Sequence, residues 1–220
     1  MSSQLALYNK ALLLCGERSL STVSDAVESR RLLDVVWNNG GVNECLSEAQ
    51  WNFAMRAVEI TYDTSITTSF GYSRAFGIPT DFVVLSAMCS DERFRSPVLG
   101  YVEEAGYWYS DYDTMYVRYV SNDVSYGGDL SAWPAPFDDF AAAHFATKIV
   151  RKLTDDQTTI SQFINLQAPS RTIRGQALKE AKSRNAMGNP TQMIAQGNWT
   201  KSRLSGGRRR DNGSYSNLTG

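Results

Sequence analysis

The sequence has little of what an enzyme or a metal protein usually needs. It contains one histidine, His144, and three widely spaced cysteines, Cys15, Cys45 and Cys89, without a CxxC pair. Phosphate-binding glycine loops, nucleophile elbows and zinc-protease motifs are all missing. We therefore expect no catalytic residue, no cofactor and no metal. The cysteines should pack in the core, and His144, within the apolar segment AAAHFA, should be packed and hydrogen-bonded.

Long apolar runs are missing as well. No stretch approaches the roughly 18 apolar residues that a membrane-spanning helix needs. The first residues, MSSQLALYNK, lack the charged lead and small-residue cleavage site of an export signal. We expect a cytoplasmic chain without membrane contact.

Negative charge is nearly absent from the last part of the chain. Residues 1–170 contain 12 Lys and Arg against 21 Asp and Glu, a net charge of −9, whereas residues 171–220 contain 10 against 2, a net charge of +8. An acidic body with a basic end predicts that this end contacts a negatively charged partner, either nucleic acid or an acidic protein surface.

Helical periodicity is clear in the first part of the chain. Residues 4–15 repeat apolar side chains three and four apart and are followed by Gly16, which predicts a core helix. A second helix is predicted to begin at Asp25, because its spacing to Glu28 is that of a capping box. The glycines within residues 38–41 disfavour a helix there, so we expect either a kink or two helices that meet.

Two further helical segments are predicted in the second half. After Pro136, apolar residues recur at helical spacing through residues 137–153. The next segment, residues 158–187, must be interrupted before Pro169, because proline removes a hydrogen bond and crowds the preceding turn.

Strand-like patterns fill the middle of the chain. Residues 53–62 and 83–120 are rich in Val, Tyr and Phe, with polar breaks between short runs. In the clearest strand, residues 115–121, alternate side chains share one face, occupied by Met115, Val117 and Tyr119. These patterns predict one small antiparallel sheet.

The order of these elements predicts an α+β architecture. We expect a four-helix bundle-like α-domain of residues 1–51 and 134–187, an inserted small antiparallel β-domain of residues 52–133, and an extended C-terminal arm of residues 188–220. Trp51 and Phe53 should pack at the seam where the chain passes from helix to strand.

The aromatic run GYWYSDYDTMYVRY, residues 106–119, suits a subunit or partner interface, where Tyr and Trp are enriched. A sugar-stacking platform of a carbohydrate-binding module is the alternative. The residues assigned to the interface are Tyr107, Trp108, Tyr109, Tyr112 and Tyr116.

The arm is rich in Gly, Asn, Ser and Arg, and Trp199 is its one large aromatic anchor candidate. Such a composition cannot bury enough apolar surface to fold alone, so we expect the arm to order on binding. Arg208, Arg209 and Arg210 could neutralise phosphates, which makes a nucleic-acid-binding protein the alternative function.

Five motifs resemble the tail tubular protein A family, the head-to-tail adaptors (gatekeepers) of short-tailed bacteriophages. They are LxxxGE at residues 12–17, the STVSD loop at 21–25 with the Glu and Arg that follow, WNFA at 51–54, GIPTDF at 77–82, and WPAPFDDFAAAHFATKIVRKLT at 133–154. Together they span about residues 5–155. The sequence departs from the family pattern at Gly40 and Gly41, where relatives keep a regular helix, and the arm does not align.

The resemblance implies a structural virion protein in the tail or neck, assembled in the host cytoplasm. Family members form a ring of twelve copies between the portal protein and the tail nozzle (tail tubular protein B), with tail fibres at the outer edge and genomic DNA passing through the lumen. By this analogy the fourth helical segment and the arm dock on the portal. The residues assigned to portal binding are Arg171, Arg174, Lys179, Lys182, Arg184, Trp199, Arg203, Arg208, Arg209 and Arg210.

Overall fold

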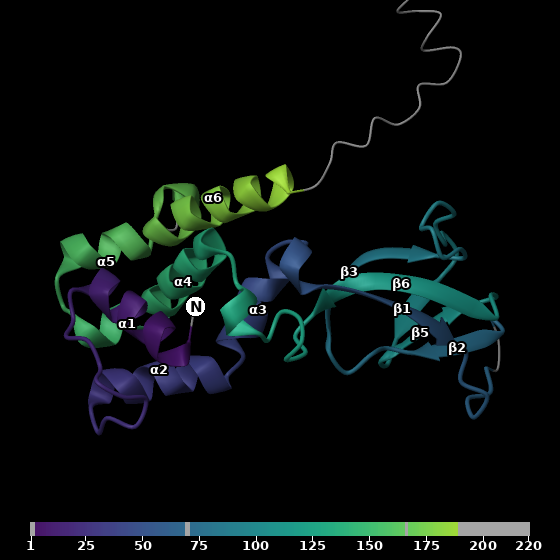
Figure 1. Cartoon of the computed structure of the whole chain (residues 1–220), viewed down its shortest axis with the longest axis horizontal. Coiled ribbons are helices and arrows are strands. Elements are labelled where there is room, and N and C mark those ends of the chain that lie inside the picture. The colour runs from purple at the N-terminus through teal and green to yellow at the C-terminus, as the bar shows by residue number, and fades with distance from the viewer. Residues whose placement is uncertain (1–2, 69–70, 166, 189–220) are drawn as a thin grey trace, which may run out of the picture. The chain divides into compact units, whose positions relative to one another are not determined.

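A computed structural model describes residues 3–68, 71–165 and 167–188 (Figure 1). Within these residues the fold is α+β, with six α-helices and two antiparallel sheets of three strands each. The predicted class is confirmed. The second and fourth predicted helical segments are each divided into two helices, at the glycines and near the proline that were predicted to interrupt them. The single predicted sheet is instead two sheets. The predicted arm falls outside the described residues, apart from Gly188.

The first helix, α1 (Gln4–Cys15), has the predicted boundaries. The Ser3 hydroxyl caps its first turn by accepting a hydrogen bond from the Ala6 amide at 3.2 Å. Gly16 ends it in the left-handed region, with φ of 77°, where an amino acid with a Cβ would be strained. Both ends of the helix are therefore set by local sequence.

The second predicted helix is two helices, α2 (Glu28–Asn38) and α3 (Gly41–Ser47). They meet at Gly40, whose φ of 83° breaks the helical path. The predicted start at Asp25 is wrong, because helix α2 begins at Glu28 after Val27. The Asp25 carboxylate instead accepts hydrogen bonds from the Ser21 and Thr22 amides of the preceding loop.

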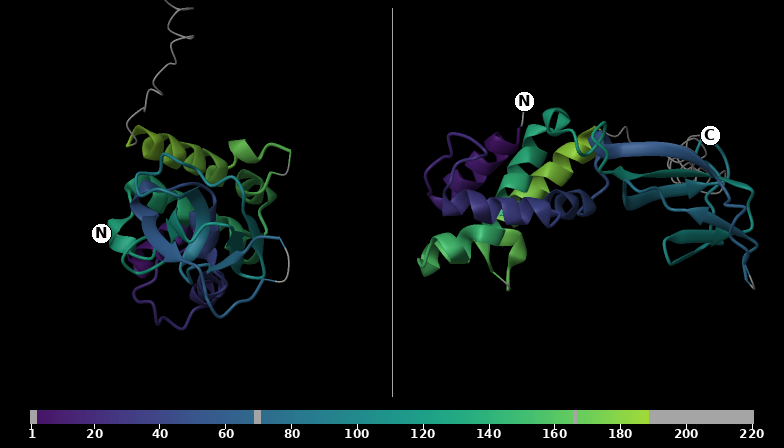
Figure 2. Two further views of the ribbon diagram at one scale, coloured as in Figure 1. Left: turned by 90° about the vertical axis from the view of Figure 1, so that its right-hand side faces the viewer. Right: turned by 90° about the horizontal axis from the view of Figure 1, so that it is seen from below.

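Helix α4 (Ala135–Leu153) is the central helix and contacts each of the other five helices of the described residues (Figures 1 and 2). The last two helices are α5 (Gln157–Phe163) and α6 (Ile173–Met187), separated by the predicted interruption around Pro169. Asp156 caps α5 by accepting hydrogen bonds from the amides of Thr158 and Thr159.

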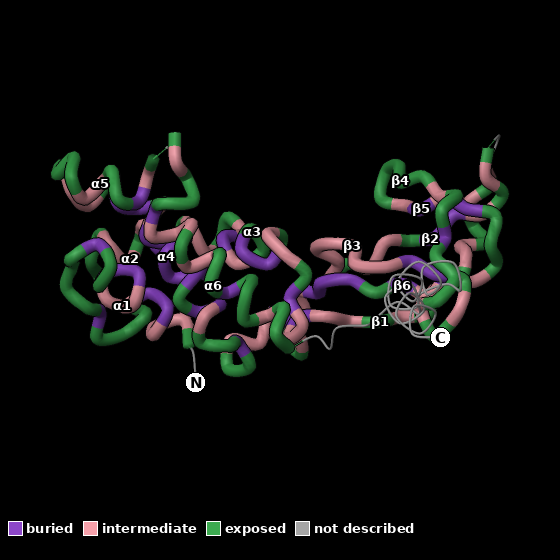
Figure 3. Tube along the Cα trace, turned by 90° about the horizontal axis from the view of Figure 1, so that it is seen from above, coloured by how far each residue is buried: buried purple, intermediate pink, exposed green. Residues whose placement is uncertain are grey.

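A continuous apolar core joins these helices. Its largest fully buried members include Tyr8 and Leu12 of α1, Leu46 of α3, and Phe140 and Phe145 of α4. Buried positions follow α4 along most of its length (Figure 3). Cys15 and Cys45 are free and belong to this core, as predicted, and Cys89 is also free and buried.

The strands form two sheets. The first has the order β1-β6-β3, from Met55–Thr61, Thr114–Ser121 and Phe82–Cys89. The second has the order β2-β5-β4, from Arg74–Gly77, Tyr107–Ser110 and Val102–Glu104. All neighbours are antiparallel, and the sheets share one apolar core in which Met115, Val117 and Tyr119 lie on the predicted buried face.

Asp81 is the polar centre of this β region. Its carboxylate accepts hydrogen bonds from Arg56 at 2.8 Å, from the Tyr119 hydroxyl at 3.0 Å and from the Ser121 hydroxyl. Burial raises the pKa of Asp81, but these three donors outweigh burial and hold that pKa below its ordinary value. The loop before β3 is thereby tied to β1 and β6.

Helical and β regions meet at the Trp51 segment. Trp51 is fully buried, and its indole N–H donates to the carbonyl of Cys45 at 3.2 Å. The rings of Trp51 and Phe53 both lie 4.8 Å from the ring of Phe137. A short 3₁₀ turn, Asn52–Ala54, leads directly into β1. The predicted packing of Trp51 and Phe53 at the seam is confirmed, and this aromatic cluster explains why no glycine or proline is needed there.

Candidate docking surface on helix α6

Most of the described residues assigned to portal binding are exposed, and they lie on helix α6 (Ile173–Met187) or just before it. Arg171, just before α6, and Lys179, Lys182 and Arg184 within it are exposed. Glu180 is the one acidic residue of this helix. We call these four residues the basic face of α6, and their charge suits a negatively charged partner.

The start of α6 is fixed by a tight turn. The Thr172 hydroxyl accepts a hydrogen bond from the Gly175 amide at 3.1 Å and donates one to the Pro169 carbonyl at 2.7 Å. A Cβ at position 175 would lie 2.2 Å from the same carbonyl oxygen, so only glycine fits there without a backbone shift. The basic face therefore begins at a defined position.

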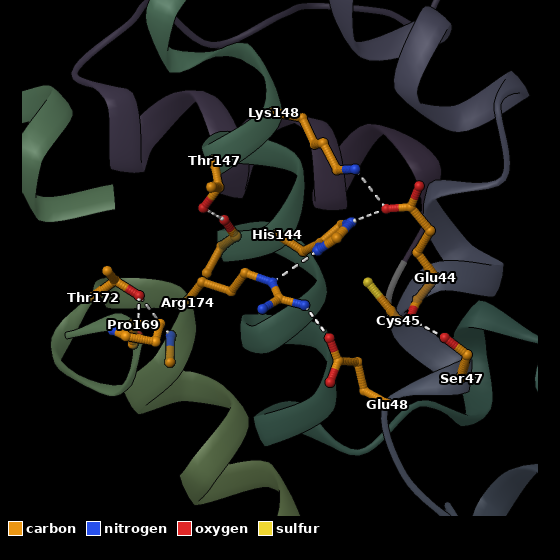
Figure 4. A network of polar contacts seen from close by, with 12 residues as sticks. Glu44, Cys45, Ser47, Glu48, His144, Thr147, Lys148, Pro169, Thr172 and Arg174 are labelled. Carbon is orange, nitrogen blue, oxygen red and sulfur yellow. Dashed lines mark hydrogen bonds and ion pairs between the residues drawn. The ribbon is translucent and has the colours of Figure 1, made fainter. Parts of the chain in front are cut away.

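Arg174 does not belong to the basic face, which corrects its assignment to portal binding. Its side chain is half-buried and turned toward α3 and α4 (Figure 4). Its Nε donates to Nδ1 of His144 at 2.9 Å, and its other end forms an ion pair with Glu48. The guanidinium of Arg174 therefore binds groups of this chain and is not presented to a partner.

His144 lies at the centre of this network and is 4% exposed. Its Nε2 is 2.9 Å from the carboxylate of Glu44, which also pairs with Lys148 at 2.7 Å. Because Arg174 can only donate, Nδ1 must be an acceptor and Nε2 must carry the ring proton. The predicted packed, hydrogen-bonded histidine is confirmed.

Burial and the neighbouring charges shift the pKa of His144. Burial, followed by the positive charge of Arg174, lowers the pKa of His144 below its ordinary value, while the hydrogen bond to Glu44 acts in the opposite direction. The hydrogen bond from Lys148 is the main reason that the pKa of Glu44 is lowered. At neutral pH the cluster therefore pairs two carboxylates with two cations around a neutral ring.

A second polar contact holds the far end of α6. Asn185 accepts a hydrogen bond from the Asn52 amide at 2.8 Å and donates one to the Gln50 carbonyl at 2.7 Å. Beside it is a mainly apolar pocket of about 230 Å³, whose lining includes Phe53 and Arg184. Helix α6 is thus tied at one end to His144 and at the other to the segment that leads into the β region.

An apolar groove lies where α6 packs beside α1 and α4. Its lining includes Ala142 and Ala143 of α4, Ile173 of α6, and Leu13 and Leu14 of α1. Leu13, in the last turn of α1, is 73% exposed. The groove has a volume of about 320 Å³, which is room for one or two large apolar side chains of a partner.

The aromatic residues assigned to an interface fall into two groups. Trp108 is fully buried between the sheets, where its ring packs 5.3 Å from Phe82 and its indole N–H donates to Glu103 at 2.9 Å. It is a core residue, which corrects its assignment. Tyr107, Tyr109 and Tyr116 are half-buried and Tyr112 is exposed, so these four still present surface.

Sequence reasoning missed the residues that hold α6. Glu44 and Glu48 lie four apart, as do His144 and Lys148, so each pair shares a helix face. That spacing was visible, but nothing local to either pair indicates that Arg174 lies between them. The remaining assigned residues, Trp199, Arg203, Arg208, Arg209 and Arg210, lie outside the described residues.

Within the residues that the structure describes, no helix is long and apolar enough to cross a membrane. No group of three or more His, Cys, Asp and Glu side chains in that part of the chain is placed to hold a metal ion. Compared with protein-family models and with curated proteins, the full sequence has no match.

Proposed function

We propose that this protein is a structural virion protein, the head-to-tail adaptor of a short-tailed bacteriophage. Twelve copies form a ring that joins the portal protein to the tail nozzle, tail tubular protein B, and lines the channel through which genomic DNA is ejected. The helical region faces the portal, and residues 188–220 form an extended arm that docks on it. The β region faces the nozzle, and tail fibres attach at the outer edge. The ring is assembled in the host cytoplasm.

The basic face of α6 carries this proposal. Three exposed cations lie on the last described helix and a fourth, Arg171, lies just before it, and the sequence beyond the helix continues with five more Lys and Arg against one Asp. The rest of the chain is acidic, so attraction to a negatively charged partner is concentrated at one end. An acidic body also suits the wall of a DNA channel, because such a wall must not hold DNA.

A ring needs two different faces of one subunit that fit each other. The apolar groove beside Leu13 is one candidate. The outer surface of α2 is the other, because Val35 of this helix is exposed, and so is Val27, the residue that precedes the helix. A neighbouring copy that inserts this α2 surface into the groove would cover both apolar surfaces with one type of contact.

Sedimentation with portal rings tests the function. We expect the full chain to co-sediment at about one copy per portal subunit, whereas a chain ending at Gly188 should bind more weakly and still be folded. A chain with the basic face neutralised by glutamine should also bind more weakly. Failure of the full chain to sediment with portal rings would contradict the adaptor function.

Engineered cysteines test the subunit contact in the portal-bound ring. The three native cysteines are buried, so new exposed ones should react selectively. We expect a disulfide between Leu13→Cys on one copy and Val35→Cys on the next, and none when either variant is present alone. Leu99→Cys, exposed in the β region, is the control. Pairing of Leu13→Cys with itself would rule out the proposed arrangement.

The second candidate is a nucleic-acid-binding protein that acts through the basic arm. The net charge of +8 over residues 171–220 favours it. Phosphate binding through this arm would weaken steeply as salt is raised, because each contact releases counterions. A mobility shift of DNA at low salt, together with no portal binding, would favour this function over the adaptor.

A further inference from the structure

Helix α6 is attached to the rest of the chain with little apolar burial. Ala181 is its one fully buried residue, and Ile173, Ala177 and Leu178 are only partly buried against the core. Burying one small side chain contributes far less to the stability of the packed helix than burying a leucine or phenylalanine does. The polar contacts at Arg174 and at Asn185 therefore carry an unusual share of the attachment.

The contact at Arg174 requires a neutral histidine. Nδ1 of His144 accepts a hydrogen bond from Nε of Arg174 at 2.9 Å, and an arginine nitrogen cannot act as the acceptor in return. A proton added to the ring can only go to Nδ1, because Nε2 already donates to Glu44. Protonation would place two donors, both on positively charged groups, against each other.

The charged groups around His144 come from all three helical elements packed there. Glu44 of α3 and Glu48 just after it are negative, while Lys148 of α4 and Arg174 of α6 are positive. Lys148 and Arg174 oppose protonation, and Glu44 favours it. Since the two carboxylates are already paired with the two cations, a charged ring would leave one positive charge uncompensated in a buried place.

We propose that His144 is a proton-sensitive latch: its neutral ring holds the N-terminal half of α6 against α3 and α4, and protonation of the ring releases that half of the helix. Arg174 then loses its hydrogen-bond partner on α4 and keeps the ion pair with Glu48 and its position over the Phe140 ring, 5.6 Å away. The Asn185 contact contains no group that titrates near neutral pH, so the far end of α6 stays attached.

The direction of the pH effect follows from the histidine. The pKa of His144 is lower in the folded chain than in the unfolded chain. The stabilisation from the latch is therefore fully present above the unfolded value of about 6.5 and is lost as the pH falls toward the lower folded value. Acid, and not base, releases the helix.

Hydrogen exchange on the full chain tests this proposal. We expect amides of residues 173–180 to lose protection as the pH falls below 6, by up to about tenfold per pH unit after correction for intrinsic exchange rates. Amides of α1 should not change. Glutamine at position 144 can accept from Arg174 and donate to Glu44 but cannot be protonated, so His144→Gln should remove the pH response. Lys182→Gln, on the same helix but outside the network, should keep it.

The single histidine allows a second measurement that needs no variant. An NMR titration of the wild-type imidazole should show the ring protonated at Nε2 at neutral pH, and the change in its signal should coincide with the loss of protection in α6. An α6 whose exchange does not respond to pH overturns the proposal, as does a His144→Gln chain that still responds. Neither measurement involves a partner, so the result does not depend on the adaptor function.

Discussion

The helical region and the β region are stabilised in different ways. The helical core gathers side chains from all the helices around α4, so most of its members have many buried neighbours. The core between the sheets is much smaller, consisting of Phe76, Met88, Val98, Trp108, Met115, Val117 and Tyr119. Two three-stranded sheets bury little surface by themselves. The β region therefore depends on a few aromatic rings and on the hydrogen bonds of Asp81. The larger helical core depends less on any single contact.

The two regions also differ in the chemistry of their exposed surfaces. The helical region presents charge, through the basic face of α6, and an apolar groove beside it. The β region presents tyrosines, of which Tyr112 is the most exposed of those assigned to an interface. The two regions therefore present chemically different surfaces, which is what the proposed adaptor function requires of a protein that joins two different partners.

Removing Trp51 should have the largest effect on stability, because Trp51 packs where the helical region and the β region meet. Trp51→Ala deletes a buried ring packed on Phe137 and the hydrogen bond to Cys45. We expect the free energy of unfolding to fall by about 5 kcal/mol, measured by urea unfolding followed by circular dichroism. Trp51→Phe should recover part of it. A loss below about 1 kcal/mol would mean that the seam does not couple the regions.

Trp108→Ala should affect the β region and spare the helices. The ring joins the two sheets and packs against Phe82, so we expect a loss of about 4 kcal/mol confined to the sheets. Hydrogen exchange should show loss of protection in β6 with α4 unchanged. Tyr112→Ala, on the exposed surface of the same region, is the control. Equal loss in α4 would show that the two cores are not separable.

Asp81→Asn should weaken the β region less than Trp108→Ala does. Asparagine keeps the shape but removes the charge that accepts from Arg56, Tyr119 and Ser121. We expect a loss of about 2 kcal/mol at neutral pH, measured by thermal unfolding, with Glu104→Gln as the exposed control.

The Asp81 effect should also depend on pH in a defined direction. The pKa of Asp81 is below its ordinary value of 3.8 in the folded chain. The stabilisation is therefore present above pH 3.8 and lost as the pH falls through the folded value. Wild-type and Asp81→Asn stabilities should converge in acid, and a constant difference would assign the effect to shape and not to charge.

Gly40→Ala should have the smallest effect. Gly40 has a φ of 83°, a conformation that costs a residue with a Cβ about 1 kcal/mol or slightly more. We expect a loss of that size in urea unfolding. Gly77→Ala is a matched control, because a Cβ there meets no atom within 4 Å. An unchanged stability for Gly40→Ala would mean that α2 and α3 can join into one helix, as in the family that the sequence resembles.

The sequence by itself determined the elements whose signals are local. The periodicity of residues 4–15 and 137–153, the interruption before Pro169, and the alternation through Met115, Val117 and Tyr119 were all predicted, because each depends on neighbours within a few residues. The helix start predicted at Asp25 was wrong for a related reason. An aspartate side chain can accept hydrogen bonds either from the first turn of a helix or from a neighbouring loop, and Asp25 accepts them from the loop before α2.

Only the tertiary structure decided which elements meet. The order β1-β6-β3, the burial of Trp108 and the placing of Arg174 between His144 and Glu48 join residues far apart in the chain. An exposed tyrosine and a buried tryptophan look alike within an alternating run, because alternation fixes two faces and does not say which one is covered. Likewise, the sequence of α6 shows several cations without distinguishing them. Only the packing around α4 shows that Arg174 holds the helix in place while the others are exposed to a partner.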